Sequence, residues 1–267
     1  MEIHQPQTRL FLWHGQALYL GQGRDSSMHQ HHALQIGISF ERPFLLRYHS
    51  QASYSPVPCF LVRPNTPHQI LSASRHSLFL WIEAESDLAR SLLVHESATG
   101  FLSEEQIAAV QTAMPFLRER STSAVTCEHA MRVVREVFSV FLPLVHFSSS
   151  IEKRLSLALQ LLKQQVYEEE TRFSPQHIAA LLHLSESRLR HVFGDQFGLS
   201  MQHYLLWQRL LAAIERTTHD LSLTQAAHDV GFADAAHFTR TFRAMFGIIP
   251  SSVLKNSHDV QVIGCPH

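Results

Sequence analysis

Two stretches near the C-terminal end share one pattern, and this repeat constrains the fold more than any other feature. Residues 173–205 read FSPQHIAALLHLSESRLRHVFGDQFGLSMQHYL, and residues 221–254 read LSLTQAAHDVGFADAAHFTRTFRAMFGIIPSSVL. Each has a capping serine, a short helix with a central alanine, a tight turn, a second helix and a closing glycine. The repetition predicts two copies of one helical unit.

Local signals predict that each copy is a pair of short helices joined by a turn. Ser174 and Ser185 are the expected helix caps in the first copy, and Ser222 and Asp234 are those in the second. Gly231 suits a turn with positive φ. Apolar residues at helical spacing predict the buried stripes Leu189, Val192, Phe193 and Phe197, and Phe238, Phe242 and Phe246. This is the helix-turn-helix plan.

The segment GFADAAHFTRTFRAMFGIIP at 231–250 resembles the signature G-F-x-(D/S)-x-x-(H/Y)-F-x-R-x-F-(K/R)-x-x-x-G-x-x-P of the AraC/XylS transcription regulators. YLLWQRLLAAIE, between the two copies, is similar to the linker helix of that family. The resemblance covers roughly Leu155 to Lys255. The chain departs from the family at Ile249, at Val253-Leu254, and at His183, where Gly is common.

The resemblance implies which side chains face DNA. In the first unit, base edges would meet Ser187, Arg190 and His191, and Arg190 suits bidentate bonding to guanine. In the second unit they would meet Ala235, Ala236, Thr239 and Arg240. The remaining members of the two predicted DNA-facing patches are Arg188, His237 and Arg243.

Charge predicts how such a protein would hold DNA. The whole chain has a net charge of −1, and residues 151–267 contain eleven Lys or Arg and eleven Asp or Glu. Non-specific binding depends on neutralising phosphates. We therefore expect weak non-specific affinity, with binding carried by the local patches on the two recognition helices.

The first 85 residues show a different pattern, of short apolar runs separated by turn residues. The runs at 9–13 and 16–21 join at His14-Gly15, a hairpin signal, and four more runs follow at 33–40, 43–50, 59–65 and 76–84. This half resembles, more loosely, the cupin-like effector barrel found in many AraC-family regulators. The residues expected to line its pocket are Phe40, Phe44, Leu46, Tyr48, Phe60, Val62, Phe79 and Trp81.

The fold class expected is α+β with two domains. Residues 1–85 form a cupin-like β-barrel, 86–150 a helical extension, 151–256 an all-α domain with two helix-turn-helix units joined by a linker helix, and 257–267 a C-terminal tail. In the extension, Met131, Val134, Phe138 and Phe141 share one face of an amphipathic helix. That helix would either support a homodimer or cover the barrel, and periodicity alone leaves both open.

Four polar residues frame the strands of the first half. His29 and His31 lie two apart, Gln35 follows, and His68 ends a proline turn. We expect these residues to line an effector pocket. A three-histidine metal site is the alternative, but Gln35 stands where metal cupins place a glutamate, so the sequence favours a pocket with no metal or cofactor.

The sequence therefore predicts a DNA-binding transcription regulator that is not an enzyme, with promoter DNA, a small-molecule effector and RNA polymerase as partners, and activation as its expected mode. A cupin-type metalloenzyme with a helical accessory domain is the alternative. Three widely spread cysteines argue against a disulfide framework. We find neither a signal peptide nor an apolar run long enough to span a membrane, so a cytoplasmic protein is expected.

Overall fold

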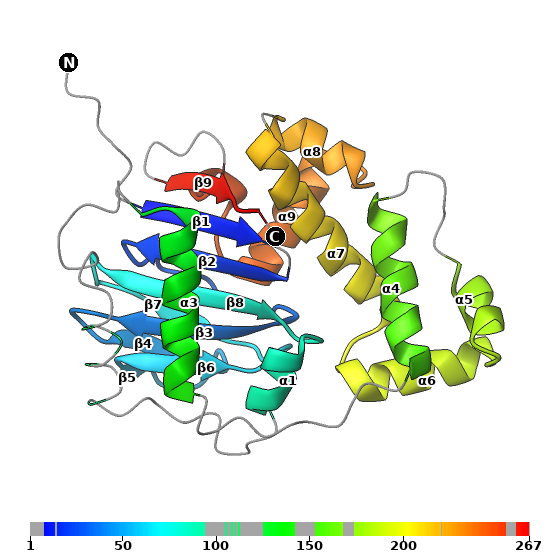
Figure 1. Ribbon diagram of the computed structural model, residues 1–267, viewed down its shortest axis with the longest axis horizontal. Coiled ribbons are helices and arrows are strands. Elements are labelled where there is room, and N and C mark those ends of the chain that lie inside the picture. Colours follow the sequence, from blue (N-terminus) through cyan, green and yellow to red (C-terminus); the bar gives the residue numbers. More distant parts are fainter. Residues whose placement is uncertain are drawn as a thin grey trace. The chain divides into compact units, whose positions relative to one another are not determined.

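A computed structural model of the chain describes residues 8–13, 15–93, 105, 108, 110, 112, 125–141, 153–167, 174–219, 221–254 and 260–266. The chain divides into two compact units (Figure 1): Met1–Ser148 with Phe242–His267, and Ser149–Thr241. Each unit has its own cluster of buried hydrophobic side chains. The first is rich in strands and the second is helical, which confirms the α+β class with a β-rich N-terminal part and a helical C-terminal part.

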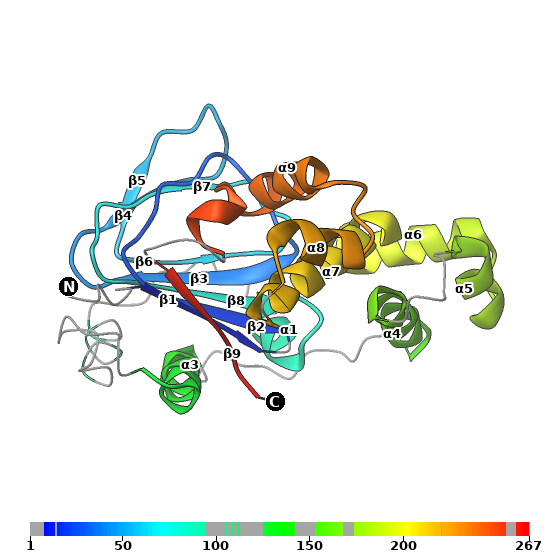
Figure 2. The same ribbon diagram turned by 90° about the horizontal axis from the view of Figure 1, so that it is seen from above.

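The first unit contains two sheets. The larger has the order β6 (Cys59–Val62), β3 (Ala33–Ser39), β8 (Ser77–Glu83), β2 (Gln16–Gly21), β1 (Thr8–Trp13) and β9 (Val260–Gly264). The smaller has the order β5 (Ser55–Val57), β4 (Phe44–Arg47) and β7 (Gln69–Leu71). Every strand pair is antiparallel except β1 with β9. Viewed from above, helix α3 and the smaller sheet lie on opposite sides of the larger sheet (Figure 2).

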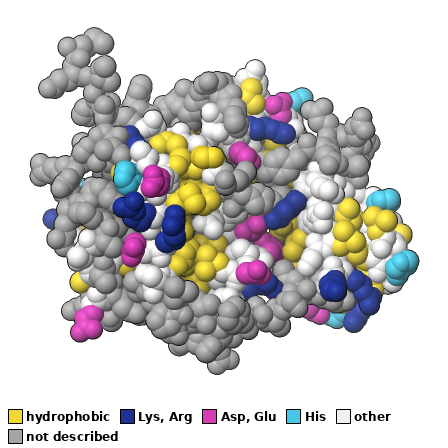
Figure 3. Space-filling view, viewed as in Figure 1, with side chains coloured by type: hydrophobic (Ala, Val, Ile, Leu, Met, Phe, Trp, Pro, Cys, Tyr) yellow, Lys and Arg dark blue, Asp and Glu magenta, His cyan; other side chains and the backbone are white. Residues whose placement is uncertain are grey.

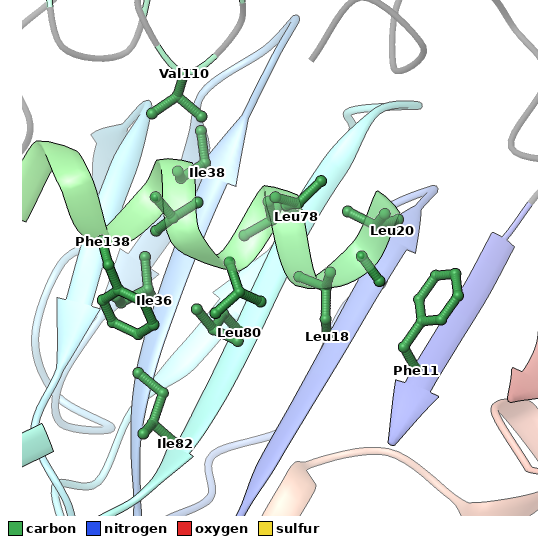
Figure 4. Close-up of a cluster of buried hydrophobic side chains, with 14 of the residues drawn as sticks. Phe11, Leu18, Leu20, Ile36, Ile38, Leu78, Leu80, Ile82, Val110 and Phe138 are labelled. Carbon is green, nitrogen blue, oxygen red and sulfur yellow. The ribbon is translucent and has the colours of Figure 1, made fainter. Parts of the chain in front are cut away.

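Helices α1 (Asp87–Leu93) and α3 (Cys127–Phe141) lie wholly in the first unit. Helix α3 crosses one face of the larger sheet, above leucine and isoleucine side chains that alternate along the strands (Figure 4). Burying this apolar surface is the main driving force for the packing. The buried side chains include Leu18, Leu20, Ile36, Ile38, Leu78, Leu80 and Ile82 from the strands, and Ala130, Val133, Val134, Val137 and Phe138 from the helix.

The face of α3 differs in part from the predicted one. Val134 and Phe138 are buried as expected, but Met131 is 40% exposed. The apolar stripe is used to cover the sheet, which is the second of the two roles that the sequence left open. Residues 103–120 of the predicted helical extension lie almost wholly outside the described residues.

The expected β-hairpin is confirmed, because β1 and β2 pair from Arg9↔Leu20 to Trp13↔Gln16. Three strands were not predicted: β5 and β7, which are three residues long, and β9, which lies in the predicted C-terminal tail. Short strands carry too little alternation to be recognised, and β9 depends on a partner about 250 residues away in sequence.

The second unit consists of helices α4 (Lys153–Tyr167), α5 (Pro175–Leu181), α6 (Glu186–Phe197), α7 (Met201–Arg216) and α8 (Leu223–Asp229), with a short 3₁₀ turn at Thr217–His219. Helix α9 (Ala235–Phe246) begins in the second unit, and its last five residues belong to the first. A further 3₁₀ turn, Pro250–Ser252, follows it. None of the described helices is long and apolar enough to cross a membrane.

A disulfide joins Cys127, at the start of α3, to Cys265, directly after β9. The sequence argument against a disulfide framework is therefore wrong for this pair. The pairing of β9 with β1 brings residue 265 to the sheet edge next to α3, and no pattern in the sequence reveals that return. Cys59 is not part of this disulfide and is buried in the first unit.

We expect replacement of one disulfide cysteine, Cys127→Ser, to lower the free energy of unfolding. The bond closes a loop spanning 138 positions, and bonds of this kind contribute about 2–4 kcal/mol. Urea unfolding of the oxidised wild type and the variant would measure the difference. A reductant should destabilise the wild type by a similar amount and leave the variant unchanged, and equal sensitivity of the two proteins would contradict the assignment.

Candidate nucleic-acid interface and histidine cluster

The first helix-turn-helix unit has the caps that the sequence predicts. The hydroxyl of Ser174 accepts a hydrogen bond from the His177 N–H at 3.3 Å and begins α5. The hydroxyl of Ser185 accepts from the Arg188 N–H at 3.2 Å and begins α6. Capping bonds satisfy amide groups that have no partner inside the helix. These two bonds fix where each helix starts.

The turn between α5 and α6 contains a residue in an unfavourable backbone conformation. His183 has a φ of 54°, in the left-handed region. Only glycine occupies this region without a steric cost. His183 therefore replaces the glycine that is common here, although the backbone keeps the left-handed conformation that glycine adopts most easily.

The second helix-turn-helix unit also follows the prediction. Ser222 and Gln225 form a reciprocal capping box with bonds of 3.2 and 3.1 Å. Gly231 has a φ of 85° in the turn. The carboxylate of Asp234 accepts from the His237 N–H at 2.6 Å and begins α9. Both helix-turn-helix units are therefore pairs of capped helices.

The predicted apolar stripes of the recognition helices are buried in part, because Val192 and Phe197 on α6 are half-buried. Leu189 and Phe193 are fully inaccessible on α6, and Phe238 and Phe242 are 1% and 3% exposed on α9. Phe246, in the last turn, is half-buried and lies 6.2 Å from the rings of both His31 and Trp81. The helical spacing of the phenylalanines did not predict these contacts of Phe246 with His31 and Trp81.

The opposite faces of α6 and α9 are accessible. In the space-filling view, arginine and histidine side chains gather over α6 (Figure 3). Eight of the ten residues predicted to face DNA are exposed and two are half-buried. The exposed ones are Ser187, Arg188, Arg190, His191, Ala236, Thr239, Arg240 and Arg243, and the half-buried ones are Ala235 and His237. Their contact with DNA stays a prediction.

Some of these side chains already have partners on their own helix. Arg190 forms an ion pair with Glu186 one turn before it, and His191 lies 3.4 Å from Asp195. The hydroxyl of Thr239 donates to the Ala235 carbonyl at 2.8 Å. Exposed pairs four residues apart stabilise a helix by only about 0.3–0.5 kcal/mol. They therefore compete weakly with a phosphate or a base.

The four polar residues predicted for the effector pocket lie together in the first unit. His29, His31, Gln35 and His68 are all buried, with exposed fractions of 6% or less. His29 and His68 face each other across an isolated antiparallel bridge, with bonds of 2.9 and 2.8 Å between their main chains. The ring centroids of these two histidines are 4.1 Å apart, and His31 lies 5.2 Å from His68.

The main chain orients each imidazole. Nδ1 of His29, His31 and His68 lies 2.8, 3.1 and 2.8 Å from the carbonyl oxygens of Ser27, Ala33 and Thr66 respectively. A carbonyl oxygen only accepts hydrogen bonds, so Nδ1 carries the proton in all three rings. The Nε2 atoms are then hydrogen-bond acceptors. Nε2 of His31 and Nε2 of His68 lie 2.8 and 3.0 Å from Oε1 of Gln35.

Burial keeps the three rings neutral. Loss of hydration lowers the pKa of His29 and His31 to about 4, and that of His68 to about 2. Mutual repulsion within the cluster adds to the effect at His31 and His68. A neutral imidazole with a defined tautomer accepts a hydrogen bond or a metal ion at Nε2.

Neighbouring polar groups were missed by the sequence analysis. His32 places Nε2 2.5 Å from Glu85 and Nδ1 3.2 Å from Asn65, and the side chains of His32 and Glu85 are buried. The Nε1–H of Trp81 is buried and has no acceptor among the described residues. Trp81 lies opposite Gln35 in the sheet register. The sheet register therefore brings Trp81 next to Gln35, while His32 directly follows His31 in the sequence.

The aromatic residues predicted to line a pocket largely contact one another. Phe44 lies 5.3 Å from both Phe60 and Phe79, and Phe79 stacks on Trp81 at 5.9 Å. Gly37 makes room for the Phe60 ring, since an added Cβ would lie 2.3 Å from it. Phe44, Leu46, Phe60, Val62 and Phe79 are buried, and Phe40, Tyr48 and Trp81 are half-buried.

The helix-turn-helix geometry agrees with comparison to known proteins: residues 178–256 match the helix-turn-helix domain family of the AraC type. The predicted resemblance to AraC/XylS-type regulators is thereby confirmed for this part of the chain. The chain is 32% identical over 99 residues to YidL, an uncharacterized transcriptional regulator of Escherichia coli K12, covering 37% of this chain and 33% of YidL. It is 38% identical over 71 residues to the transcriptional activator RhaR of Pectobacterium atrosepticum, covering 26% of this chain and 25% of RhaR. The chain thus spans about a third or less of these relatives.

Solved structures show the same overall fold. Apo ToxT from Vibrio cholerae strain SCE256 has a TM-score of 0.61 at 11% identity, covering 89% of this chain and 96% of ToxT. ToxT from strain O395 bound to (E)-4-(8-methylnaphthalen-1-yl)but-3-enoic acid has a TM-score of 0.56 at 14% identity, with the same coverage. At this identity the likeness concerns the fold alone.

We expect His183→Gly to raise the free energy of unfolding by about 1 kcal/mol, because glycine removes the steric cost of a left-handed backbone. Thermal or urea unfolding would measure the gain. His177→Gly, inside helix α5 with an exposed side chain, is the control and should lose stability by a comparable amount. Loss of stability in both variants would contradict the strain at His183.

The histidine cluster should make stability depend on pH. These rings have native pKa values below the unfolded value of about 6.5. Between about pH 6.5 and pH 4 the unfolded chain therefore binds more protons than the native state, so stability falls as pH falls.

Urea unfolding with a chelator at about pH 7 and about pH 5 would measure this loss. His68→Gln should lose less stability than the wild type over the same interval, because it removes one titrating ring. An unchanged pH dependence in His68→Gln would show that histidines elsewhere cause the effect.

Proposed function

We propose that this chain is an effector-responsive transcription regulator that binds promoter DNA through residues 151–256 and a small molecule through residues 1–85. One observation carries the proposal: two capped helix pairs each present an exposed face with arginines, on α6 and α9. Helices of this kind enter the major groove and read base edges. The match of residues 178–256 to a helix-turn-helix family supports the same reading.

The DNA contacts we propose are those of the two accessible faces. Arg190 has the best geometry for specificity, because it projects from the first half of α6 and can exchange its pair with Glu186 for guanine. Arg240 has no ion pair among the described residues and is its counterpart on α9. Ser187 and His191 complete the first face.

The effector, on this proposal, is recognised in the first unit. The two sheets would form the cupin-type barrel expected from the sequence, with His29, His31, Gln35 and His68 as its polar groups and the Nε1–H of Trp81 as an available donor. One structurally similar protein, ToxT, is described with a bound unsaturated fatty acid. That supports a small-molecule role for this half and leaves the chemistry of the effector here to experiment.

Activation through RNA polymerase is the mode we propose, because RhaR is named a transcriptional activator. Residues 86–150 would join the sensing and DNA-binding regions, and dimerisation would extend the DNA site to repeated half-sites. We also propose a cytoplasmic location, because a regulator that binds promoter DNA must have access to it.

Arg190→Ala tests the proposal once bound promoter sites have been mapped across the genome. We expect it to weaken binding to the cognate site by about 1–3 kcal/mol. Thermal stability should hardly change, since the side chain is 64% exposed. Electrophoretic mobility shift or fluorescence anisotropy with promoter fragments would measure affinity.

Arg132→Ala is a matched control. Arg132 is an exposed arginine paired with Glu128 one turn away, 3.8 Å apart, on α3. It reproduces the local environment of Arg190 outside the recognition helices, so its loss should leave DNA affinity unchanged. Equal effects of the two substitutions, or no binding to any promoter fragment, would overturn the proposed function.

A further inference from the structure

We propose that His29, His31 and His68 bind one divalent transition-metal ion of the Zn²⁺ class through their Nε2 atoms. Each residue offers one ligand atom, and these atoms lie within 4.8 Å of one another in the buried cluster. Nitrogen ligands of a tetrahedral zinc ion are about 3.3 Å apart, from Zn–N bonds of about 2.0–2.1 Å. Small rotations of the three rings would bring the nitrogens to this spacing.

The backbone brings the three ligands together before any ion binds. His29 and His68 are held opposite each other by two main-chain bonds, the His29 N–H to the His68 carbonyl and the reverse, at 2.9 and 2.8 Å. His31 follows two residues after His29, and its ring lies 5.8 Å from the His29 ring. Little ordering is left for the metal to impose, which favours tight binding.

The orientation of the rings is the strongest argument. All three Nδ1 atoms donate to backbone carbonyl oxygens, those of Ser27, Ala33 and Thr66. Metal-ligating histidines characteristically donate their second ring N–H in this way, which fixes the tautomer and aims the other nitrogen at the ion. A histidine packed only as core would have no reason to share this polarity with two neighbours.

Gln35 explains how the cluster is satisfied without the ion. Its Oε1 lies 2.8 and 3.0 Å from Nε2 of His31 and Nε2 of His68. The oxygen and both ring atoms are acceptors, so turning the amide over, which places its NH₂ with two protons at that position, gives each ring atom a donor. Binding of a metal ion would take the same two lone pairs and displace this amide. A neutral amide is a weak ligand, so the site would have three protein ligands and an open position.

The test uses untagged full-length protein freed of metal with a chelator, and Zn²⁺ alone as the probe. Isothermal titration calorimetry should give one tight site, elemental analysis after dialysis should give one ion per chain, and Zn²⁺ should raise the melting temperature. The variant His29→Gln, His31→Gln, His68→Gln should lose all three.

Surface histidines require a control, because the chain has 20 histidines. His177, His203 and His228 are exposed and lie in the second unit. Their combined replacement by Gln should leave the tight site intact. Loss of tight binding in this control, or its retention in the cluster variant, would overturn the proposal.

A second variant keeps the proposal testable if the triple replacement fails to fold. Gln35→Glu places a carboxylate beside two of the ligands, and it should tighten Zn²⁺ binding by about tenfold or more. Unchanged or weaker affinity in folded Gln35→Glu would count against the site. None of these measurements depends on DNA binding, so their failure would leave the regulator function untouched.

Discussion

The alternation of side chains along the larger sheet determines what both of its faces can do. On β8, Leu78, Leu80 and Ile82 point into the core beneath α3, and Phe79 and Trp81 point to the other side. The same pleat places Ile36 and Ile38 in the core and Gln35 near the histidines. Successive residues alternate between faces, so a shift of register by one residue would exchange core and polar interior. The buried core thereby holds the histidine cluster in place.

Local features of the sequence were sufficient to predict the helical half. Caps at Ser174, Ser185, Ser222 and Asp234 depend on contacts within three residues, and all four form as expected. Spacing along one helix likewise predicts the buried Phe193, Phe238 and Phe242, although Phe197 and Phe246 of the same stripes are only half-buried. Interactions that operate within a single turn leave a direct mark on the sequence.

Other features depend on residues far apart and could not be predicted. Nothing local to Cys265 indicates Cys127 as its partner, because β9 must first pair with β1. The histidines show both cases. The spacing of His29 and His31 was visible, but the proton positions follow from carbonyl oxygens that only the folded loops supply. Gln35, which stands where metal cupins place a glutamate, argued against a metal, and its place between two rings is part of the basis for the metal site that we propose.

The path of the chain has a consequence for dissecting the protein. The second unit is inserted within the first, since residues 149–241 are followed by a segment that returns to the sheet as β9. A protease nick between α3 and α4 would not release the DNA-reading fragment, which stays joined through a covalent sulfur bridge and a ladder of main-chain bonds. A fragment expressed from residue 149 onward would contain β9 without its partner strand β1. The main-chain groups of β9 and the side chains of Val260 and Ile263 would then be exposed, and such unpaired strand edges promote aggregation.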